Sequence, residues 1–116
     1  MPELHKLTPY LGVLQDRGQR VALLTDGRMS GASGKILAAI QVTPEAEAGG
    51  LIGKIAPGDM ISIDATKGTM SVEVSSTPRP APHLAPRHSG MGRELFHIFR
   101  KSVSDAESGA SVLEEY

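Results

Sequence analysis

The four aromatic residues lie near the two ends of the chain, and the long middle segment contains none. Aromatic side chains bury the largest apolar area per residue, so a segment without them has to pack with aliphatic side chains alone. At 116 residues the chain fits a single domain, which should bury roughly two thirds of its unfolded surface. We therefore expect one modest, aliphatic core. The aromatic residues are Tyr10, Phe96, Phe99 and Tyr116.

The composition argues against several classes of protein. Hydrophobic residues make up 40% and charged residues 22%, which is typical of a folded, soluble domain. A net charge of −1 disfavours a general nucleic-acid or membrane-surface binder, and no apolar run approaches the roughly 20 residues of a membrane span. The start lacks the apolar region of a signal peptide, so we expect a cytoplasmic protein. Because cysteine is absent, the chain cannot form disulfides, ligate an iron–sulfur cluster or use a thiol in catalysis.

The charges are unevenly distributed. Residues 1–77 are nearly balanced, residues 78–101 carry five basic side chains and one acidic, and residues 102–116 carry four acidic and no basic ones. This pattern indicates a basic helix followed by an acidic tail on a solvated surface, with an anion-binding role for the basic stretch as the alternative.

Turn residues and apolar runs predict the order of the first elements. Thr8, which is followed by proline, has the pattern of an N-cap, and Gly18 is a stop signal, so residues 9–17 should form a helix. The apolar runs 21–25 and 36–43 are typical of buried strands.

Three further strands are expected in the middle of the chain, at 51–55, 60–64 and 69–75. Short turns separate them, so they should form an antiparallel meander. In the last of them apolar and polar residues alternate, which places Met70 and Val72 on the inward face.

The C-terminal part begins with proline. Residues 76–89 hold four of the eight prolines, which favours an extended segment, and residues 90–104 have the pattern of an amphipathic helix. We divide the chain into residues 1–77, a linker at 78–89, and a helix with a tail at 90–116. The fold class expected from these patterns is mainly β with flanking helices.

A glycine-rich loop, DGRMSGASG, follows the first predicted strand at residues 26–34. Glycines let successive backbone N–H groups point into one concavity, which suits an anion or an oxyanion. The loop is not a phosphate-binding P-loop, because Met29 stands where that motif needs glycine and Ile36 where it needs serine or threonine. Asp26 should hold the loop by accepting hydrogen bonds from its backbone. A plain connecting loop remains the alternative.

Four stretches of the sequence resemble one enzyme family. They are LTDGRMSGASGK in the loop, MPELHKLTPYLGVLQDRG at the start, VTPEAEAGGLIGKIAPGDMISID in the middle and GMGRELFHIFRKSVSDAESGAS near the end. Together they resemble the C-terminal domain of the iron–sulfur sugar-acid dehydratases, the family of dihydroxy-acid dehydratase and 6-phosphogluconate dehydratase. The opening MPELHKLTP and the closing GMGRELF are more similar to the phosphogluconate branch.

The resemblance implies a fold and a set of partners. The implied fold is a swivelling β/β/α barrel-like domain that closes over an active site, here truncated at its N-terminal side. Family enzymes are several times longer and hold their cluster through cysteines of a large N-terminal domain, so a C-terminal piece that is inactive alone is expected. The implied partners are that N-terminal domain, 6-phosphogluconate and a second copy in a homodimer. The alternatives are another sugar-acid substrate, or a non-catalytic anion-binding or protein-interaction module that kept the fold.

The resemblance also implies a reaction and site residues. The branch dehydrates 6-phospho-D-gluconate to 2-dehydro-3-deoxy-6-phosphogluconate in the Entner–Doudoroff pathway, with an iron–sulfur cluster and Mg²⁺. Ser30 corresponds to the serine thought to act as base, and Glu3 to a carboxylate ligand of Mg²⁺. Three residues are candidate contacts to the substrate carboxylate or phosphate: Arg28, Ser33 and Lys35.

Each of these residues also has a purely structural interpretation. Ser30 fits a turn residue that bonds its own backbone, Glu3 a solvated carboxylate and Lys35 a surface charge. The histidines lack the spacing of metal ligands and are expected at the surface. They are His5, His83, His88 and His97.

Overall fold

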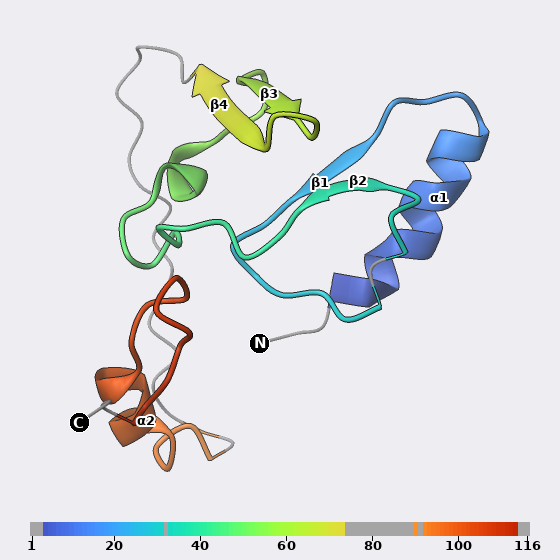
Figure 1. Cartoon of the computed structure of the whole chain (residues 1–116). Coiled ribbons are helices and arrows are strands. Elements are labelled where there is room, and N and C mark those ends of the chain that lie inside the picture. Colours follow the sequence, from blue (N-terminus) through green and yellow to red (C-terminus); the bar gives the residue numbers. More distant parts are fainter. Residues whose placement is uncertain (1–3, 32, 74–89, 91, 114–116) are drawn as a thin grey trace.

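The structure is a small mixed α/β arrangement with two separate pairs of strands (Figure 1). This computed structural model describes residues 4–31, 33–73, 90 and 92–113. No helix among those residues has both the length and the apolar character needed to cross a membrane. The elements are η1 (Leu4–Leu7), α1 (Thr8–Asp16), β1 (Ala22–Leu24), β2 (Leu37–Ala39), η2 (Leu51–Lys54), β3 (Met60–Asp64), β4 (Thr69–Glu73) and α2 (His97–Ser102).

The first helix is confirmed to within one residue at each end. Its C-terminus has the hydrogen bonds of a Schellman motif, in which the Gly18 N–H donates to the Gln15 carbonyl and the Gln19 N–H to the Leu14 carbonyl. Gly18 has φ +85°, a conformation that glycine adopts at no steric cost. The N-cap prediction for Thr8 is wrong, because η1 continues directly into the helix and makes Thr8 its first residue.

The strands β1 and β2 form a parallel pair that aligns Ala22 with Leu37 and Leu24 with Ala39. A parallel pair needs a crossover of about a dozen residues or more, and residues 25–36, which include the glycine-rich loop, supply it. Both strands were predicted, but they are shorter than the apolar runs at 21–25 and 36–43.

The strands β3 and β4 form the expected antiparallel hairpin, which pairs Ile61 with Val72. The turn that precedes it is closed by the Asp59 carboxylate, which accepts a hydrogen bond from the Ala56 N–H at 2.9 Å. Ile61 and Val72 are half-buried, as the alternation predicts, whereas Met70 is 42% exposed.

The strand predicted at 51–55 is wrong, because this segment forms the 3-10 helix η2. Two of its apolar side chains, Ile52 and Ile55, lie three residues apart and are half-buried, which suits a helical turn better than a strand. The preceding Gly50 is packed so closely that a Cβ atom there would lie 1.8 Å from the Pro44 carbonyl oxygen. This close approach of Gly50 to Pro44, where the same turn begins, fixes the path of the chain into η2.

The C-terminal helix is shorter than predicted. Only α2 is helical, because Gly90 and Gly92 have φ +83° and +79° and the residues up to Phe96 form turns instead. Two apolar residues of the predicted amphipathic helix are open to solvent, since Leu95 and Ile98 are each 72% exposed. The tail beyond α2 doubles back, since the Ser104 N–H donates to the Ser111 carbonyl at 2.8 Å.

The fold class was therefore predicted only in part. The strands are few and the described residues mix helix and strand, so "mainly β" is corrected to a small mixed α/β fold. The barrel-like arrangement is not confirmed, because the described strands form two unconnected two-stranded sheets. The predicted linker at 78–89 lies outside the described residues.

The expected aliphatic core is not formed among the described residues. Ile36 is the one hydrophobic residue among them that is buried. Fourteen large hydrophobic residues of the described part are exposed instead, Leu51, Leu95 and Ile98 among them. The described elements therefore leave uncovered apolar surface that a compact domain would bury.

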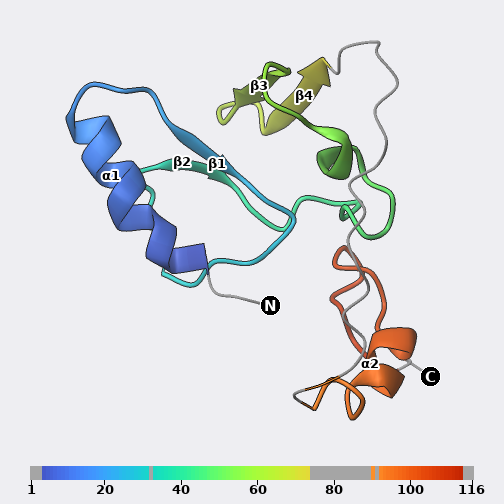
Figure 2. The same ribbon diagram turned by 180° about the vertical axis from the view of Figure 1, so that it is seen from behind.

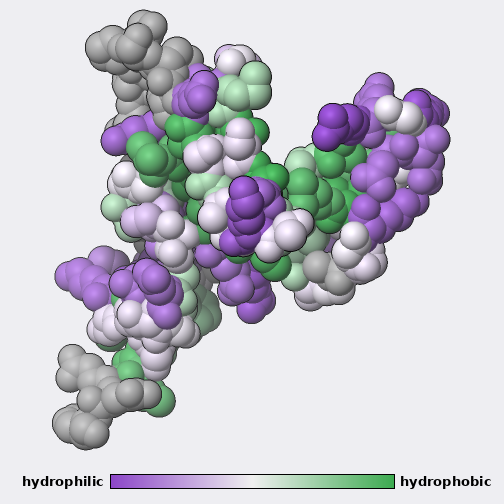
Figure 3. All heavy atoms as spheres, turned by 45° about the horizontal axis from the view of Figure 1, so that its top comes forward, coloured by the Kyte–Doolittle hydropathy of each residue, from purple (hydrophilic) through white to green (hydrophobic). Residues whose placement is uncertain are grey.

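The open shape is visible from both sides of the molecule. Figure 2 shows α1 and the β1–β2 pair on one side, with the hairpin and the C-terminal segment on the other. In Figure 3, apolar side chains gather between the hairpin and the β1–β2 pair and reach the surface, whereas the outer face of α1 is polar. A groove of about 380 Å³ in this region is lined mainly by aliphatic residues of β1, η2 and the hairpin, such as Leu24, Leu51 and Ile61.

Candidate functional site

The glycine-rich loop leaves the end of β1 and runs beside α1 before it enters β2 (Figure 1). Its described residues form no regular element, as predicted. Gly31 and Gly34 have φ +68° and +75°, which is why glycine is favoured at these two bends. The loop is therefore an irregular segment whose position has to come from its contacts with other elements.

The N-terminal end of the loop is held by three hydrogen bonds. The Gly27 N–H donates to the Thr25 hydroxyl at 2.9 Å, and the Gly27 carbonyl accepts from the Gln41 N–H at 2.9 Å. The Asp26 carboxylate accepts from the Ala46 N–H at 2.8 Å. Asp26 was expected to bond the loop's own backbone. Instead it ties the loop to the turn after β2, because the loop and that turn leave neighbouring strand ends.

The C-terminal end of the loop is held against the last turn of α1. The Lys35 ammonium lies 2.9 Å and 3.0 Å from the two carboxylate oxygens of Asp16. The adjacent Gln15 side chain donates to the Lys35 carbonyl at 3.0 Å. The Lys35 N–H donates in turn to the Ser33 hydroxyl at 3.4 Å. The side chains of the ion pair are 51% and 65% exposed, so the pair stabilises the structure by at most about 1 kcal/mol.

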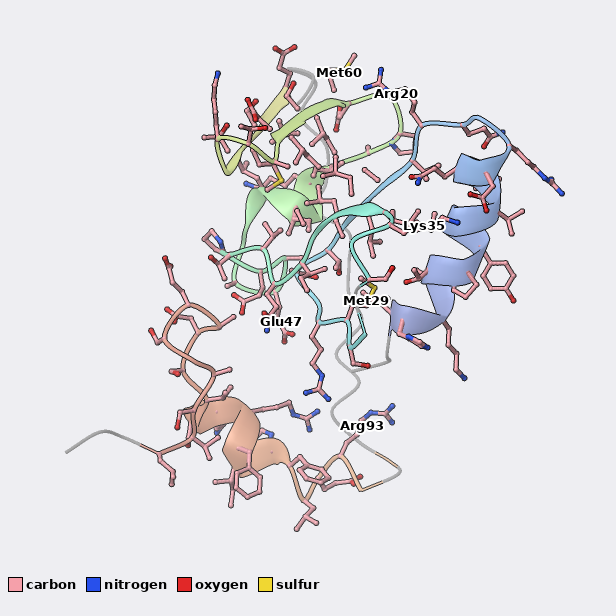
Figure 4. All side chains as sticks on the ribbon, turned by 45° about the vertical axis from the view of Figure 1, so that its right-hand side comes forward. Arg20, Met29, Lys35, Glu47, Met60 and Arg93 are labelled. Atoms are coloured by element: carbon pink, nitrogen blue, oxygen red, sulfur yellow. The ribbon has the colours of Figure 1, made fainter. Side chains whose placement is uncertain are left out.

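The middle of the loop touches α1 through Met29. The Thr8 hydroxyl donates to the Met29 sulfur at 3.4 Å, and Figure 4 shows Met29 and Lys35 both directed toward the helix. Arg28 and Ser30, which flank Met29, are both exposed. Alternate side chains thus anchor the loop and leave the residues at 28 and 30 at the surface.

A hollow of about 250 Å³ lies between α1 and the loop. Gly31 lies beside the His5 imidazole, where a Cβ atom would make ordinary contact at 3.5 Å from Nδ1. Gly12 lies beside Lys35 on the helix side, where a Cβ atom would make ordinary contact at 3.7 Å from Nζ. The hollow is lined by His5, Thr8, Pro9, Gly12, Val13, Asp16, Gly31 and Lys35.

The chain does not fit the iron–sulfur cluster that the sequence resemblance implies. It contains no cysteine, and its described residues contain no group of three or more His, Asp or Glu side chains that could hold a metal ion. Glu3, the predicted ligand of Mg²⁺, lies outside the described residues. A metal ion at this loop would need ligands from outside the described residues.

Four of the five predicted site residues, all except Glu3, share one loop, and they have different surroundings. Arg28 and Ser30 are exposed, whereas Lys35 pairs with α1. Sequence reasoning missed the part of α1 and η1 in this site, namely His5, Thr8, Gln15 and Asp16. Their contacts join residues about twenty positions apart, and nothing in the sequence marks them.

The electrostatics near the C-terminal turns differ from those of the loop. The Gly90 N–H, which donates to the Glu94 carboxylate, lowers the pKa of Glu94, with a smaller contribution from its own N–H and from Arg93 and Arg100. The Ser108 hydroxyl and N–H lower the pKa of Asp105 in the same way. Both carboxylates serve as turn caps and are fully exposed, so they stabilise local turns and form no part of the site.

Comparison with known proteins places the chain among dehydratases. A family model described as the dihydroxy-acid/6-phosphogluconate dehydratase C-terminal domain matches residues 1–110. A phosphogluconate dehydratase of Rhizobium meliloti is 56% identical across 97% of this chain, and that of Escherichia coli K12 is 48% identical across 97%. A dihydroxy-acid dehydratase of Campylobacter fetus is 38% identical across 80%. The chain spans about a fifth of the length of these relatives, between 17% and 20%.

Proposed function

Because the chain belongs to the dihydroxy-acid/6-phosphogluconate dehydratase C-terminal family, we propose that it is the active-site-covering domain of a phosphogluconate dehydratase. The substrate would be 6-phospho-D-gluconate and the product 2-dehydro-3-deoxy-6-phosphogluconate, as in the Entner–Doudoroff pathway. The observation that carries this proposal is the 56% identity across 97% of the chain with a relative named phosphogluconate dehydratase. The match with a dihydroxy-acid dehydratase is weaker, which favours the phosphorylated substrate.

In the proposed reaction, Ser30 takes the proton from C2 of the sugar acid. The electron pair of that C–H bond forms the C2–C3 double bond, hydroxide leaves C3, and the resulting enol tautomerises to the 2-keto acid. The carboxylate next to C2 is already negative and makes this proton weakly acidic, so the base has to act as an alkoxide. Arg28, two residues before Ser30, and the N–H groups of the loop are the groups of this chain that would favour the alkoxide.

The loop geometry supports this role. A base has to reach its substrate while it stays in a fixed position, and residue 30 is exposed on a loop that is anchored at both ends and through Met29. The candidate substrate contacts Arg28, Ser33 and Lys35 lie on the same loop, within five residues of Ser30. We assign the iron–sulfur cluster and Mg²⁺ to the intact enzyme, with cluster ligands from polypeptide outside this chain.

The exposed apolar side chains support the requirement for more polypeptide. Fourteen large hydrophobic residues of the described part are exposed, and exposed apolar surface of this kind marks sites that another polypeptide covers. Most of the active site would be built when the domain covers its partner, so the isolated chain should be inactive.

An activity assay tests the proposal directly. The purified chain is incubated with 6-phosphogluconate, iron and Mg²⁺, and the 2-keto acid is measured, with and without the separately produced cysteine-containing part of a phosphogluconate dehydratase. We expect no product from the chain alone and turnover when the two parts are combined. Product from the chain alone would refute the claim that activity requires the cluster-bearing part of the enzyme. No product from the combined parts would refute the assignment to this enzyme.

The second candidate function is a non-catalytic interaction module. It is favoured by the fourteen large hydrophobic residues that are exposed among the described part of the chain. Titration with sugar acids while the amide signals of residues 27–35 are recorded separates the two functions. Shifts confined to this loop favour the dehydratase half-site. No shift, combined with self-association in light scattering, favours the interaction module.

A further inference from the structure

We infer that the hollow between α1 and the glycine-rich loop is the subsite for the phosphoryl group of the sugar acid. This inference rests on the proposed function and adds His5 and Thr8 to the residues expected to contact substrate. It also gives Lys35 a specific ligand, the phosphate oxygens.

The hollow has the donors that a phosphate monoester requires. Such a group carries close to two negative charges at neutral pH and three strong acceptor oxygens. The Lys35 ammonium, the His5 imidazole and the Thr8 hydroxyl line one hollow of about 250 Å³. The Thr8 O–H donates to the Met29 sulfur in this structure, so it has to turn away from that contact to reach a phosphate oxygen. Charge-assisted hydrogen bonds of this kind are the stronger ones in proteins.

Asp16 is the one acidic residue among those lining the hollow, and it holds the lysine in place. Its two carboxylate oxygens bind the Lys35 ammonium at 2.9 Å and 3.0 Å. An ammonium has three N–H donors, so contacts with two oxygens leave a donor for an anion. Asp16 also reduces the positive charge of the hollow, and affinity for a free phosphate should therefore be weak, on the order of millimolar.

Two glycines lie beside these donors. A Cβ atom would lie 3.5 Å from Nδ1 of His5 at Gly31 and 3.7 Å from Nζ of Lys35 at Gly12, which are ordinary contact distances, so it is the φ of +68° and not a lack of space that favours glycine at position 31. Gly31 directly follows Ser30, so the hollow adjoins the proposed base. A sugar acid bound with C2 at Ser30 has its phosphate several bonds away at the other end, and the inferred subsite requires that this end reach the hollow.

Amide chemical shifts test the subsite in the 116-residue chain. Inorganic phosphate, gluconate and 6-phosphogluconate are titrated separately. We expect phosphate and 6-phosphogluconate to shift the amide signals of Gly31 and Lys35, and Lys35→Met and His5→Ala each to weaken phosphate binding roughly tenfold. Lys67→Met is the matched control, because Lys67 lies in the turn of the hairpin and pairs with Asp64. Equal effects of Lys35→Met and Lys67→Met, or shifts spread over all exposed lysines, would overturn the subsite.

If the isolated chain does not fold, the subsite is tested with Lys35→Met and His5→Ala in a full-length phosphogluconate dehydratase that carries this chain. Lys35→Met should raise KM for 6-phosphogluconate roughly tenfold or more, with kcat within about threefold of the parent. A fall in kcat with unchanged KM would overturn the phosphate role.

Gluconate separates failure of the subsite from failure of the proposed function. If gluconate shifts residues 27–30 while phosphate leaves Gly31 and Lys35 unmoved, the dehydratase loop stands and the subsite is refuted. If phosphate shifts Gly31 and Lys35 while gluconate and 6-phosphogluconate leave residues 27–30 unmoved, the anion site stands and the dehydratase role of the loop is refuted.

Discussion

Replacing Gly50 by alanine should destabilise the chain through steric overlap and not through strain of its own φ and ψ angles. Gly50 has φ −57° and ψ 152°, a conformation that alanine adopts without strain. The added Cβ atom would lie 1.8 Å from the Pro44 carbonyl oxygen, 2.6 Å from the Pro44 carbonyl carbon and 2.9 Å from the Glu45 carbonyl oxygen. Ordinary contact begins at 3.4 Å, so the shortest of these distances has to grow by 1.6 Å (3.4 minus 1.8).

The magnitude follows from what such a shift disturbs. Moving Pro44 and Glu45 weakens the hydrogen bond from the Gly50 N–H to the Glu45 carbonyl, which is 2.8 Å long, and the bond from the Ala46 N–H to Asp26. Overpacking costs about 1–3 kcal/mol, and each weakened hydrogen bond adds about 0.5–1.5 kcal/mol. Together these effects should lower the free energy of unfolding by about 2–6 kcal/mol.

Urea unfolding followed by circular dichroism measures this effect, with Gly12→Ala as the control. Gly12 lies inside α1, and its Cβ atom would lie 3.7 Å from the flexible end of Lys35, which is ordinary contact. Alanine in a helix interior is about 0.8–1 kcal/mol more favourable than glycine, so this variant should be the more stable one. If Gly50→Ala unfolds within about 0.5 kcal/mol of the parent, the argument from close backbone packing is refuted.

Three further predictions follow from single contacts. Asp26→Ala should lower the free energy of unfolding by about 1–3 kcal/mol, because it leaves the Ala46 N–H without its acceptor. Asp26→Asn keeps an acceptor and should lower it less. Equal rates of hydrogen exchange at the Ala46 amide in the two variants would contradict this prediction. The pKa of Glu94 is lowered from its usual 4.5, mainly by the hydrogen bond from the Gly90 N–H. This contact therefore stabilises the turn above pH 4.5, and the stabilisation is lost as the pH falls through the folded-state pKa. A carbon-13 titration of the Glu94 carboxyl with a midpoint at or above 4.5 would contradict this prediction. The exposed Leu95 and Ile98 should promote self-association of the isolated chain. Replacing both by serine should shift the mass measured by light scattering toward that of the monomer. An unchanged mass would exclude this surface as the site of self-association.

Local signals in the sequence predicted part of the fold correctly. The stop at Gly18, the turn closed by Asp59 and the hairpin of β3 and β4 depend on residues a few positions apart, so their patterns are readable. The helix predicted at 90–104 was too long because its two glycines were treated as compatible with helix, although both adopt φ values that end one. That error could have been avoided from sequence alone.

Other features depend on contacts between distant residues and could not be predicted. The 3-10 helix η2 arises where Gly50 packs against Pro44, which an apolar run does not reveal. The irregular backbone predicted for the glycine-rich loop is confirmed for its described residues, whereas its role as the site stays a prediction. Its anchoring by Asp16 and Ala46, nineteen and twenty positions from their partners, was not foreseen because no local pattern encodes it. The roles of Ser30, Arg28, Ser33, Lys35 and Glu3 stay predictions.

The central claim is that the side-chain oxygen of Ser30, as an alkoxide, removes the C2 proton of the sugar acid, and one measurement tests it most directly. The serine is replaced by alanine in a full-length phosphogluconate dehydratase that carries this chain, and kcat is compared with that of Ser62→Ala, which alters an exposed serine of β3. Loss of a proton-transfer group costs roughly a hundredfold to ten-thousandfold in rate. The account predicts a loss of this size for Ser30→Ala, together with loss of exchange of the C2 proton with solvent. Equal kcat values for the two variants would contradict the account.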